Sequence, residues 1–222
     1  MLDVFLGFIT NINGAFYLIA YFVGALPFGF LLVKLFFGID ITQVGSGSIG
    51  ATNVYRALKE NHPQQAKLFS IITIVLDATK GLIVVLFAKI FGLDYSTQWM
   101  IALLAIIGHC YSPYLGFNGG KGVATAIGSV FLLIPIEGFL GLLVWGFIGK
   151  VLKISSLSSL FGVLSGIFFT FIIPYLFKLP ESINILSQIH SHIPVILIGI
   201  LILYTHIPNI KRLFKGEEKK VL

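Results

Sequence analysis

Long apolar runs joined by short polar connections limit the fold of this sequence more than any other feature. A helix needs about 20 apolar residues to cross the hydrocarbon core of a membrane. We predict spanning helices near residues 4–37, 68–92, 97–112, 122–135, 137–151, 157–177 and 189–206. Charged residues make up only 11% of the chain, and no polar block of about 50 residues stands apart as a second domain. We therefore expect one integral membrane domain over residues 1–222.

These runs predict an all-α, polytopic transmembrane bundle of seven helices. The runs at 122–135 and 137–151 are short and meet at Pro135 and Glu137. They can instead be half-crossings or a re-entrant pair, which leaves five spans.

Basic residues separate by side in either version. One side collects Lys34, Arg56, Lys59, Lys67, Lys121, Lys150, Lys153, Lys211, Arg212, Lys215, Lys219 and Lys220, and the other holds only Lys89 and Lys178. Because cytoplasmic connections carry an excess of Lys and Arg, we place the C-terminus and the Gly-rich connections in the cytoplasm and the N-terminus outside.

Composition also limits the possible partners and cofactors. The net charge of +6 does not indicate a nucleic-acid partner, because the basic residues stand at the ends of apolar runs, where membrane orientation accounts for them. Cys110 is the only cysteine, which excludes an internal disulfide and a cysteine metal cluster. The sequence near His109 lacks the carboxylates and repeated histidines of a zinc site. We expect no metal and no cofactor.

Residues 45–56 read GSGSIGATNVYR and have the composition of an anion-binding loop. Glycines allow backbone N–H groups to converge, and the side-chain donors Ser46, Ser48, Thr52 and Asn53 stand among Gly45, Gly47 and Gly50. A helix starting near Ala51 would add its positive end, with Arg56 about one turn further on. The alternative is a flexible turn between helices, with Ser and Thr as helix caps.

Residues 116–122 repeat this composition as GFNGGKG. Gly119, Gly120 and Gly122 surround Lys121, whose ammonium group would add a point charge to the backbone donors at a phosphate. His109 lies upstream at a predicted helix end, where a histidine is more often structural than catalytic.

Three further groups of polar residues stand at or near the predicted cytoplasmic ends. Asp77 and Lys80 are three positions apart and would form a structural ion pair on one helical face. The serines at 155, 156, 158 and 159 either contact a polar ligand or cap and pack a helix. His206, Asn209 and Arg212 repeat every three residues after the last run, where basic residues also commonly mark the inner side.

Taken in order, GSGSIGATNVYR, GHCYSPYLGFNGGKGVAT and HIPNIKRLFKGEE resemble the three cytoplasmic motifs of the PlsY family, the bacterial glycerol-3-phosphate acyltransferases that use acyl phosphate as donor. The stretches YFVGALPFGF at 21–30 and LDATKG at 76–81 are also similar to that family. The resemblance implies a seven-helix enzyme of the bacterial inner membrane with its active site facing the cytoplasm. It would transfer an acyl group from acyl phosphate to the 1-hydroxyl of glycerol 3-phosphate, forming 1-acylglycerol 3-phosphate (lysophosphatidate) and phosphate in phospholipid biosynthesis.

The resemblance also implies residue roles and partners. Ser46, Gly47, Thr52 and Asn53 would surround the acyl-phosphate head, Arg56 would serve both phosphates, and Lys121, His206, Asn209 and Ser156 would hold glycerol 3-phosphate. The catalytic set is then Ser46, Arg56, Lys121, His206 and Asn209, and the remaining substrate-binding residues are Gly45, Gly47, Thr52, Asn53, His109, Gly119, Gly120, Gly122 and Ser156. Coupling to upstream acyl-phosphate synthesis and downstream acylation in the lipid membrane follows from the same resemblance.

Acyl phosphate is already activated, so no covalent acyl-enzyme is needed. We favour a substrate-assisted route, in which the donor's phosphate takes the hydroxyl proton, over His109 or His206 as general base.

Five positions depart from the family's pattern: Thr42, Ser48, Asn118, Thr205 and Pro208. Each departure removes a positive charge or an amide near the expected phosphates. The enzyme would then have an altered substrate affinity or an altered acceptor, or it would be a weakly active paralogue. Pro208 further predicts a kink just before Asn209. The competing functional class is a transporter or binding protein for an organic phosphate, which would use the same cationic pocket without chemistry.

Overall fold

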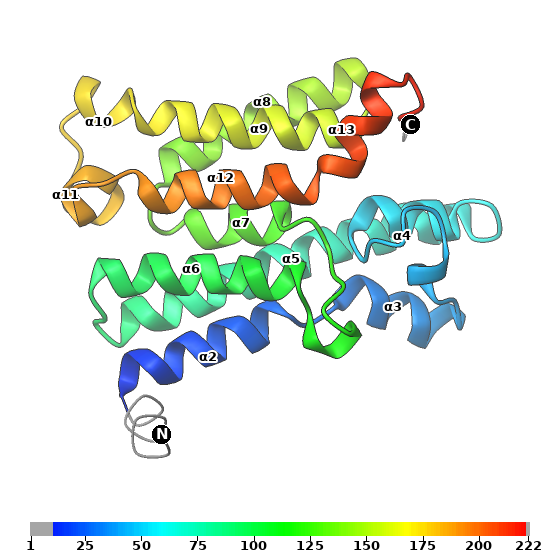
Figure 1. Ribbon diagram of the computed structural model, residues 1–222, viewed down its shortest axis with the longest axis horizontal. Helices are drawn as coiled ribbons and strands as arrows, with labels where there is room; N and C mark the ends of the chain where they lie inside the picture. The colour runs from blue at the N-terminus through cyan, green and yellow to red at the C-terminus, as the bar shows by residue number, and fades with distance from the viewer. Residues whose placement is uncertain (1–10, 221–222) are drawn as a thin grey trace.

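The structure is a computed structural model that describes residues 11–220, and within that range it is entirely helical, without strands (Figure 1). The larger helices are α2 (Ile12–Gly24), α3 (Phe28–Phe37), α4 (Ala51–Leu58), α5 (Pro63–Ile90), α6 (Tyr95–Cys110), α7 (Val123–Val130), α8 (Pro135–Leu152), α9 (Ser155–Thr170), α12 (Ile193–Thr205) and α13 (Ile207–Phe214). Shorter elements are η1 (Ile41–Gln43), η2 (Pro113–Leu115), α10 (Ile173–Leu176), η3 (Glu181–Ile183) and α11 (Ile185–Ile189). The predicted all-α class is therefore confirmed for the described residues.

Helix lengths separate full crossings from shorter segments. Among residues 11–220, α5, α8 and the stretch Ser155–Leu176 are each long and apolar enough to cross a membrane, and counting each of two bent pairs as one span gives up to five. At 18 residues, α8 is longer than the half-crossing we considered for 137–151. In contrast, α7 has eight residues, or about 12 Å of helix. Helix length thus supports up to five spans, and seven stays a prediction.

The first predicted span is not one continuous helix. Helices α2 and α3 meet at Leu26 and Pro27 with a bend of 40°, because proline cannot supply the N–H that a continuing helix needs. Residues 4–10 of that predicted span, and with them the predicted outside N-terminus, lie outside the described residues. The break leaves α3 free to run toward the first Gly-rich loop.

Glycines allow three helix pairs to approach closely. A side chain at Gly24 would collide with the backbone of Ala105, which joins α2 to α6, and one at Gly128 would collide with Ala78, which joins α7 to α5. On α8 and α9, the Cα of Gly166 would lie 3.2 Å from a Cβ added at Gly141. Small residues at helix crossings are the usual way to gain packing contact in a membrane.

The four Gly-, Ser- or charge-rich connections all lie at one end of the bundle, the end that carries α4 and α13 in Figure 1. The plainer connections, after α5 and around α11, lie at the opposite end. A small apolar cluster of Val33, Ile41, Ile49, Val54, Leu58 and Ala66 holds the first loop against α3, α4 and α5. The relative sides predicted for these connections are therefore confirmed.

Candidate active site

A cavity of about 170 Å³ lies where the four polar connections meet. The sequence-predicted residues that line it are Ser46, Thr52, Asn53, Arg56, His109, Lys121, Gly122, Ser156, His206 and Asn209. Gly47, Gly119 and Gly120 line a wider recess that shares Ser46, Lys121 and Asn209 with this cavity. Residues more than 150 positions apart in the sequence thus form one polar site.

Asn53 organises the first loop. Its Nδ2 donates to the backbone oxygens of Ile41 at 2.8 Å and Val44 at 3.0 Å, and its Oδ1 accepts from the backbone N–H of Ser46 at 3.1 Å. Both amide hydrogens are therefore committed to the backbone, and the side chain is buried. In this arrangement Asn53 positions Ser46, so its direct contact with substrate stays a prediction.

Gly45 and Gly47 have the backbone conformation that the loop requires. Their φ angles are +61° and +70°, in the left-handed region that non-glycine residues adopt only with strain. A side chain on Gly45 would also collide with Asn53. Gly45 lines neither cavity, so its contribution is to shape the loop.

Helix α4 begins at Ala51, as the sequence predicted, and its first turn points Thr52 across the site. Thr52 Oγ1 and Ser155 Oγ lie 2.8 Å apart, which ties the first loop to the start of α9. Arg56 lies one turn further along α4 and lines the same cavity. A helix start, a hydroxyl pair and a guanidinium group together form a suitable place for an anion.

The second loop packs against the end of α6. Gly120 donates its N–H to the backbone oxygen of His109 at 2.9 Å, and a side chain at Gly120 would collide with the His109 ring. This contact leaves room only for glycine and brings the next residue, Lys121, into the cavity. Helix α7 then begins at Val123 directly after the loop, as predicted.

Asp77, Lys80 and His109 form a buried cluster beneath the second loop. Lys80 Nζ lies 2.8 Å from Asp77 Oδ1 and 2.9 Å from His109 Nδ1, and it donates to the backbone oxygen of Leu26 at 2.7 Å. The predicted ion pair is confirmed. His109 Nδ1 must accept from the lysine, so this nitrogen is occupied by a structural contact, and the predicted role of His109 in substrate binding stays a prediction.

The end of the chain completes the site through a helix break. Helices α12 and α13 are bent by 57° at His206, two residues before Pro208, which agrees with the predicted kink. His206 Nδ1 lies 2.8 Å from the backbone oxygen of Ile202. Because a carbonyl only accepts, Nδ1 carries the proton, and the neutral ring offers Nε2 as an acceptor.

Glu218 is a functional candidate that the sequence interpretation did not assign. Its carboxylate accepts from Ser156 Oγ at 2.8 Å, Asn209 Nδ2 at 2.6 Å and Arg212 Nε at 2.7 Å. Burial by itself raises the pKa of Glu218, but these three donors hold it below its usual value. The only signal in the sequence is an acidic pair that directly follows a basic helix.

Lys121 is a charged residue of the second loop whose pKa lies well below its usual value. Burial lowers its pKa, the charge of Glu218 opposes this shift, and the charges of Arg212 and Arg56 add to it, with a pKa of about 8 as the result. The lysine therefore stands among like charges with a single carboxylate to balance them. Such a site favours an incoming dianion.

The residues that depart from the family pattern all lie around this site, but they do not line the same space. Ser48 lines the cavity, whereas Thr42, Asn118, Thr205 and Pro208 line only the wider recess. Thr205 Oγ1 donates to the backbone oxygen of Lys121 at 3.1 Å and so supports the second loop.

Comparison with known proteins agrees with these motifs. A family model described as glycerol-3-phosphate acyltransferase matches residues 14–216. The chain belongs to the glycerol-3-phosphate acyltransferase family. Curated members of this family include a protein from Helicobacter hepaticus that is 65% identical over 96% of both chains. Another, from Wolinella succinogenes, is 50% identical over 98% of this chain and all of its own length.

Two solved structures of PlsY are similar to the structure of this chain. The glycerol 3-phosphate form of PlsY, an integral membrane glycerol 3-phosphate acyltransferase, aligns with a TM-score of 0.79 at 36% identity over 94% of both chains. A lysophosphatidic acid form of the enzyme aligns with a TM-score of 0.76 at 35% identity. The chain is therefore a membrane acyltransferase of phospholipid synthesis, which favours catalysis over the transporter that we considered from sequence.

Proposed function

We propose that this acyltransferase uses acyl phosphate as donor and forms 1-acylglycerol 3-phosphate (lysophosphatidate) and phosphate. The convergence of two Gly-rich loops on one cationic cavity carries this proposal, because both substrates bring a phosphate group. The cavity also shares Trp145 and Ser159 with an apolar groove, as a substrate with a fatty tail requires. Solved forms of PlsY named for glycerol 3-phosphate and lysophosphatidic acid support the same acceptor and product.

The donor's phosphate fits best against the first loop. Ser46, Gly47 and Thr52 would supply directional donors beside the start of α4, and Arg56 would supply charge from the same helix. The hydrogen bonds of Asn53 hold the first loop in place without substrate, so the loop loses little conformational entropy on binding.

Glycerol 3-phosphate would occupy the other half of the cavity. Lys121 would hold its phosphate, and Asn209 and Ser156 would support it from α13 and α9. His206 Nε2 is an acceptor in the neutral ring and would receive a hydrogen bond from a glycerol hydroxyl. Arg56 would lie within reach of both phosphates and bring the two substrates together.

The proposed reaction is a direct transfer. The glycerol 1-hydroxyl oxygen attacks the acyl carbon, the bond between that carbon and the phosphate oxygen breaks, and the departing phosphate takes the hydroxyl proton. Lys121 and Arg56 stabilise the charge that gathers on the phosphate, and the fixed geometry supplies the rest of the acceleration. Since phosphate is a good leaving group, Ser46 acts as a hydrogen-bond donor and forms no acyl intermediate.

The proposed setting is the bacterial inner membrane, with the site facing the cytoplasm. The excess of Lys and Arg at the α4 and α13 end supports this orientation. A cytoplasmic site would receive acyl phosphate from an enzyme that makes it at the membrane and glycerol 3-phosphate from solution. The product would pass to an enzyme that acylates its second hydroxyl.

The decisive assay incubates purified protein with palmitoyl phosphate and glycerol 3-phosphate and follows phosphate and lysophosphatidate. We expect both products in equal amounts, and none with palmitoyl-CoA as donor. Transfer from palmitoyl-CoA alone would overturn the proposed donor, and phosphate release without glycerol 3-phosphate would indicate hydrolysis. Uptake of glycerol 3-phosphate into liposomes without acyl transfer would favour a transporter.

Two substitutions test the phosphate contacts. Arg56→Ala and Lys121→Ala should each raise the KM for glycerol 3-phosphate about ten- to a hundredfold, the cost of losing a charged hydrogen bond. Lys59→Ala is a matched control, since Lys59 is exposed and caps the same helix as Arg56. Unchanged KM values in the two cavity variants would refute these assignments.

A further inference from the structure

Helix α13 has two unlike faces. On one face, Asn209 and Arg212 donate to the same carboxylate at the active site. On the other face, Ile207, Lys211 and Phe214 follow at intervals of four and three residues, which places them in one row along the helix. All three side chains of this outer row are exposed. The helix therefore carries site residues on one face and a mixed apolar and basic row on the other.

Phe214 is the residue of the outer row that most needs an explanation. It is 90% exposed, the highest value among the large apolar side chains of residues 11–220. Lys211 and Lys215, both exposed, stand on either side of it in the sequence. An excess of lysine marks the inner side of a membrane protein, but that preference does not account for a phenylalanine between the lysines. Because apolar surface is unfavourable in water, the outer row is suited to contact with lipid.

The bend before α13 keeps Phe214 at the level of the lipid. The exposed Ile193 begins α12 at the opposite end of the bundle, about 21 Å of helix before Ile207. Because α13 is bent by 57° from α12, the stretch from Ile207 to Phe214 adds about 6 Å in the direction of α12 instead of about 10 Å. Phe214 then lies about 27 Å from Ile193 along that direction, which is within the thickness of about 30 Å of a hydrocarbon core.

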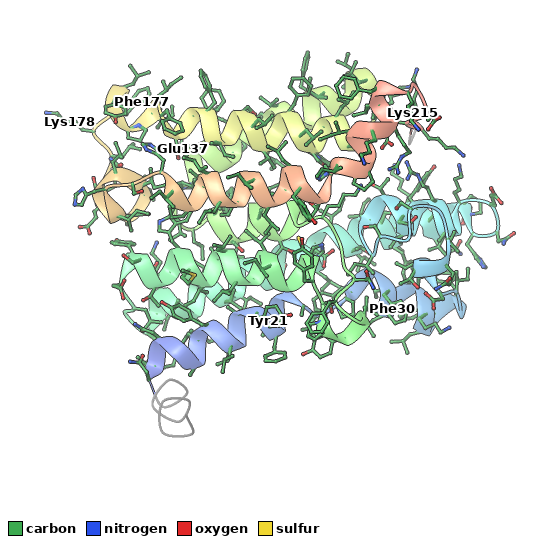
Figure 2. The ribbon with its side chains drawn as sticks, in the orientation of Figure 1. Tyr21, Phe30, Glu137, Phe177, Lys178 and Lys215 are labelled. Atoms are coloured by element: carbon green, nitrogen blue, oxygen red, sulfur yellow. The ribbon has the colours of Figure 1, made fainter. Side chains whose placement is uncertain are left out.

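We propose that α13 docks on the anionic lipid surface beside the active site. Phe214 enters the boundary between headgroups and acyl chains, and Lys211 and Lys215 bind headgroup phosphates. Helices that lie in a membrane interface combine an apolar aromatic residue with lysines in this way, and each lysine is attracted to anionic lipid. Figure 2 shows Lys215 at the end of the bundle opposite to Phe177 and Lys178, so this surface lies on the same side of the membrane as the phosphate site.

Docking gives the membrane a part in holding the active site. Asn209 is the one residue of α13 that is fully buried, so contacts within the protein hold this helix at few points. Lipid contact on the outer row supports the helix from its other side and so steadies Asn209 and Arg212. This inference does not depend on the identity of the acyl donor.

A spin label measures where Phe214 lies. Phe214→Cys supplies the attachment point, since Cys110, the single native cysteine, is buried. Full-length protein is placed in nanodiscs of phosphatidylcholine and phosphatidylglycerol. Collisions of the label with oxygen, which concentrates in lipid, are then compared with collisions with a water-soluble nickel complex. Leu143→Cys, on the exposed side of α8, gives the lipid reference, and Glu60→Cys, in the exposed turn after α4, gives the water reference.

We expect the label at position 214 to collide with oxygen more than with nickel, as at position 143. The double variant Lys211→Gln/Lys215→Gln tests the charges, and Lys59→Gln/Lys67→Gln is the matched control, since it removes two exposed charges elsewhere. Each lysine at an anionic surface contributes about fivefold to affinity, so the first pair should weaken docking about thirtyfold and raise nickel collisions at position 214. The control pair should leave them unchanged, and nanodiscs without phosphatidylglycerol should act like the first pair.

Three outcomes would overturn the inference. Nickel collisions at position 214 as frequent as at position 60 would place the outer row in water. Few collisions with either reagent would mean that a protein surface covers it. Unchanged collisions after loss of both lysines would exclude a role for anionic headgroups. None of these measurements uses acyl transfer, so a protein that docks but accepts no acyl phosphate would overturn the proposed function alone.

Discussion

The pKa of Lys121 makes glycerol 3-phosphate use sensitive to pH. Burial and the neighbouring arginines together lower this pKa to about 8 against the opposing charge of Glu218, so the substrate-free enzyme loses the charge of Lys121 as pH rises through about 8. A bound phosphate dianion stabilises the charged lysine. Binding above pH 8 therefore requires uptake of a proton, and affinity falls as pH rises.

The expected magnitude follows from the fraction of charged lysine. That fraction falls from about nine-tenths at pH 7 to about one-tenth at pH 9, so kcat/KM for glycerol 3-phosphate should fall about tenfold over this interval. The assay measures initial rates at saturating palmitoyl phosphate, with glycerol 3-phosphate varied at each pH. Since its phosphate loses its second proton near pH 6, the acceptor itself stays a dianion throughout the range.

Lys121→Arg separates this effect from other titrations. A guanidinium group stays charged at pH 9, so the variant should show a flat profile between pH 7 and pH 9 even if its activity is lower. A tenfold fall that persists in Lys121→Arg would assign the titration to another group. A flat wild-type profile would refute the lowered pKa.

Three further substitutions test the site. Gly120→Ala should lower kcat/KM for both substrates at least tenfold, because its Cβ collides with the His109 ring, whereas Gly146→Ala, with open space around it, should leave activity intact; equal effects would contradict the packing. Ser48→Asn should retain or improve transfer, and abolished transfer in the same assay would contradict the family alignment at that position. Glu218→Ala should lower kcat/KM for glycerol 3-phosphate about ten- to a hundredfold, because three donors lose their carboxylate, and wild-type kinetics would show that Glu218 is dispensable.

Local signals in the sequence were sufficient for much of the fold. The apolar runs predicted α5 and α9 closely, and Gly50 before Ala51 predicted the start of α4. Proline at 208 predicted the break before Asn209, because a missing N–H has the same effect in any context. Proline at 27 has the same chemistry, yet we predicted a helix that continued past it, since the apolar run continues on both sides.

The contacts within the site depend on tertiary packing and could not be read from spacing. An asparagine in a Gly- and Ser-rich loop suggests a contact with substrate, but the amide hydrogens of Asn53 bind backbone oxygens of its own loop. Glu218 received no role from the sequence, whereas in the structure the chain after the bend at His206 brings it to Ser156, which is 62 positions earlier. In both cases a polar side chain near a cavity can bind the substrate or the protein, and the sequence does not distinguish the two.

The contact between Glu218 and Ser156 can form only after the end of the chain has been synthesised. The first loop and α4 are synthesised early, yet Lys121, His206 and Glu218 follow only as later segments leave the ribosome. A partly inserted chain would therefore contain the first anion loop without the residues that we assign to the acceptor. Acyl transfer would begin only after the last helix is in place, so an unfinished chain in the membrane could not consume the acyl donor productively.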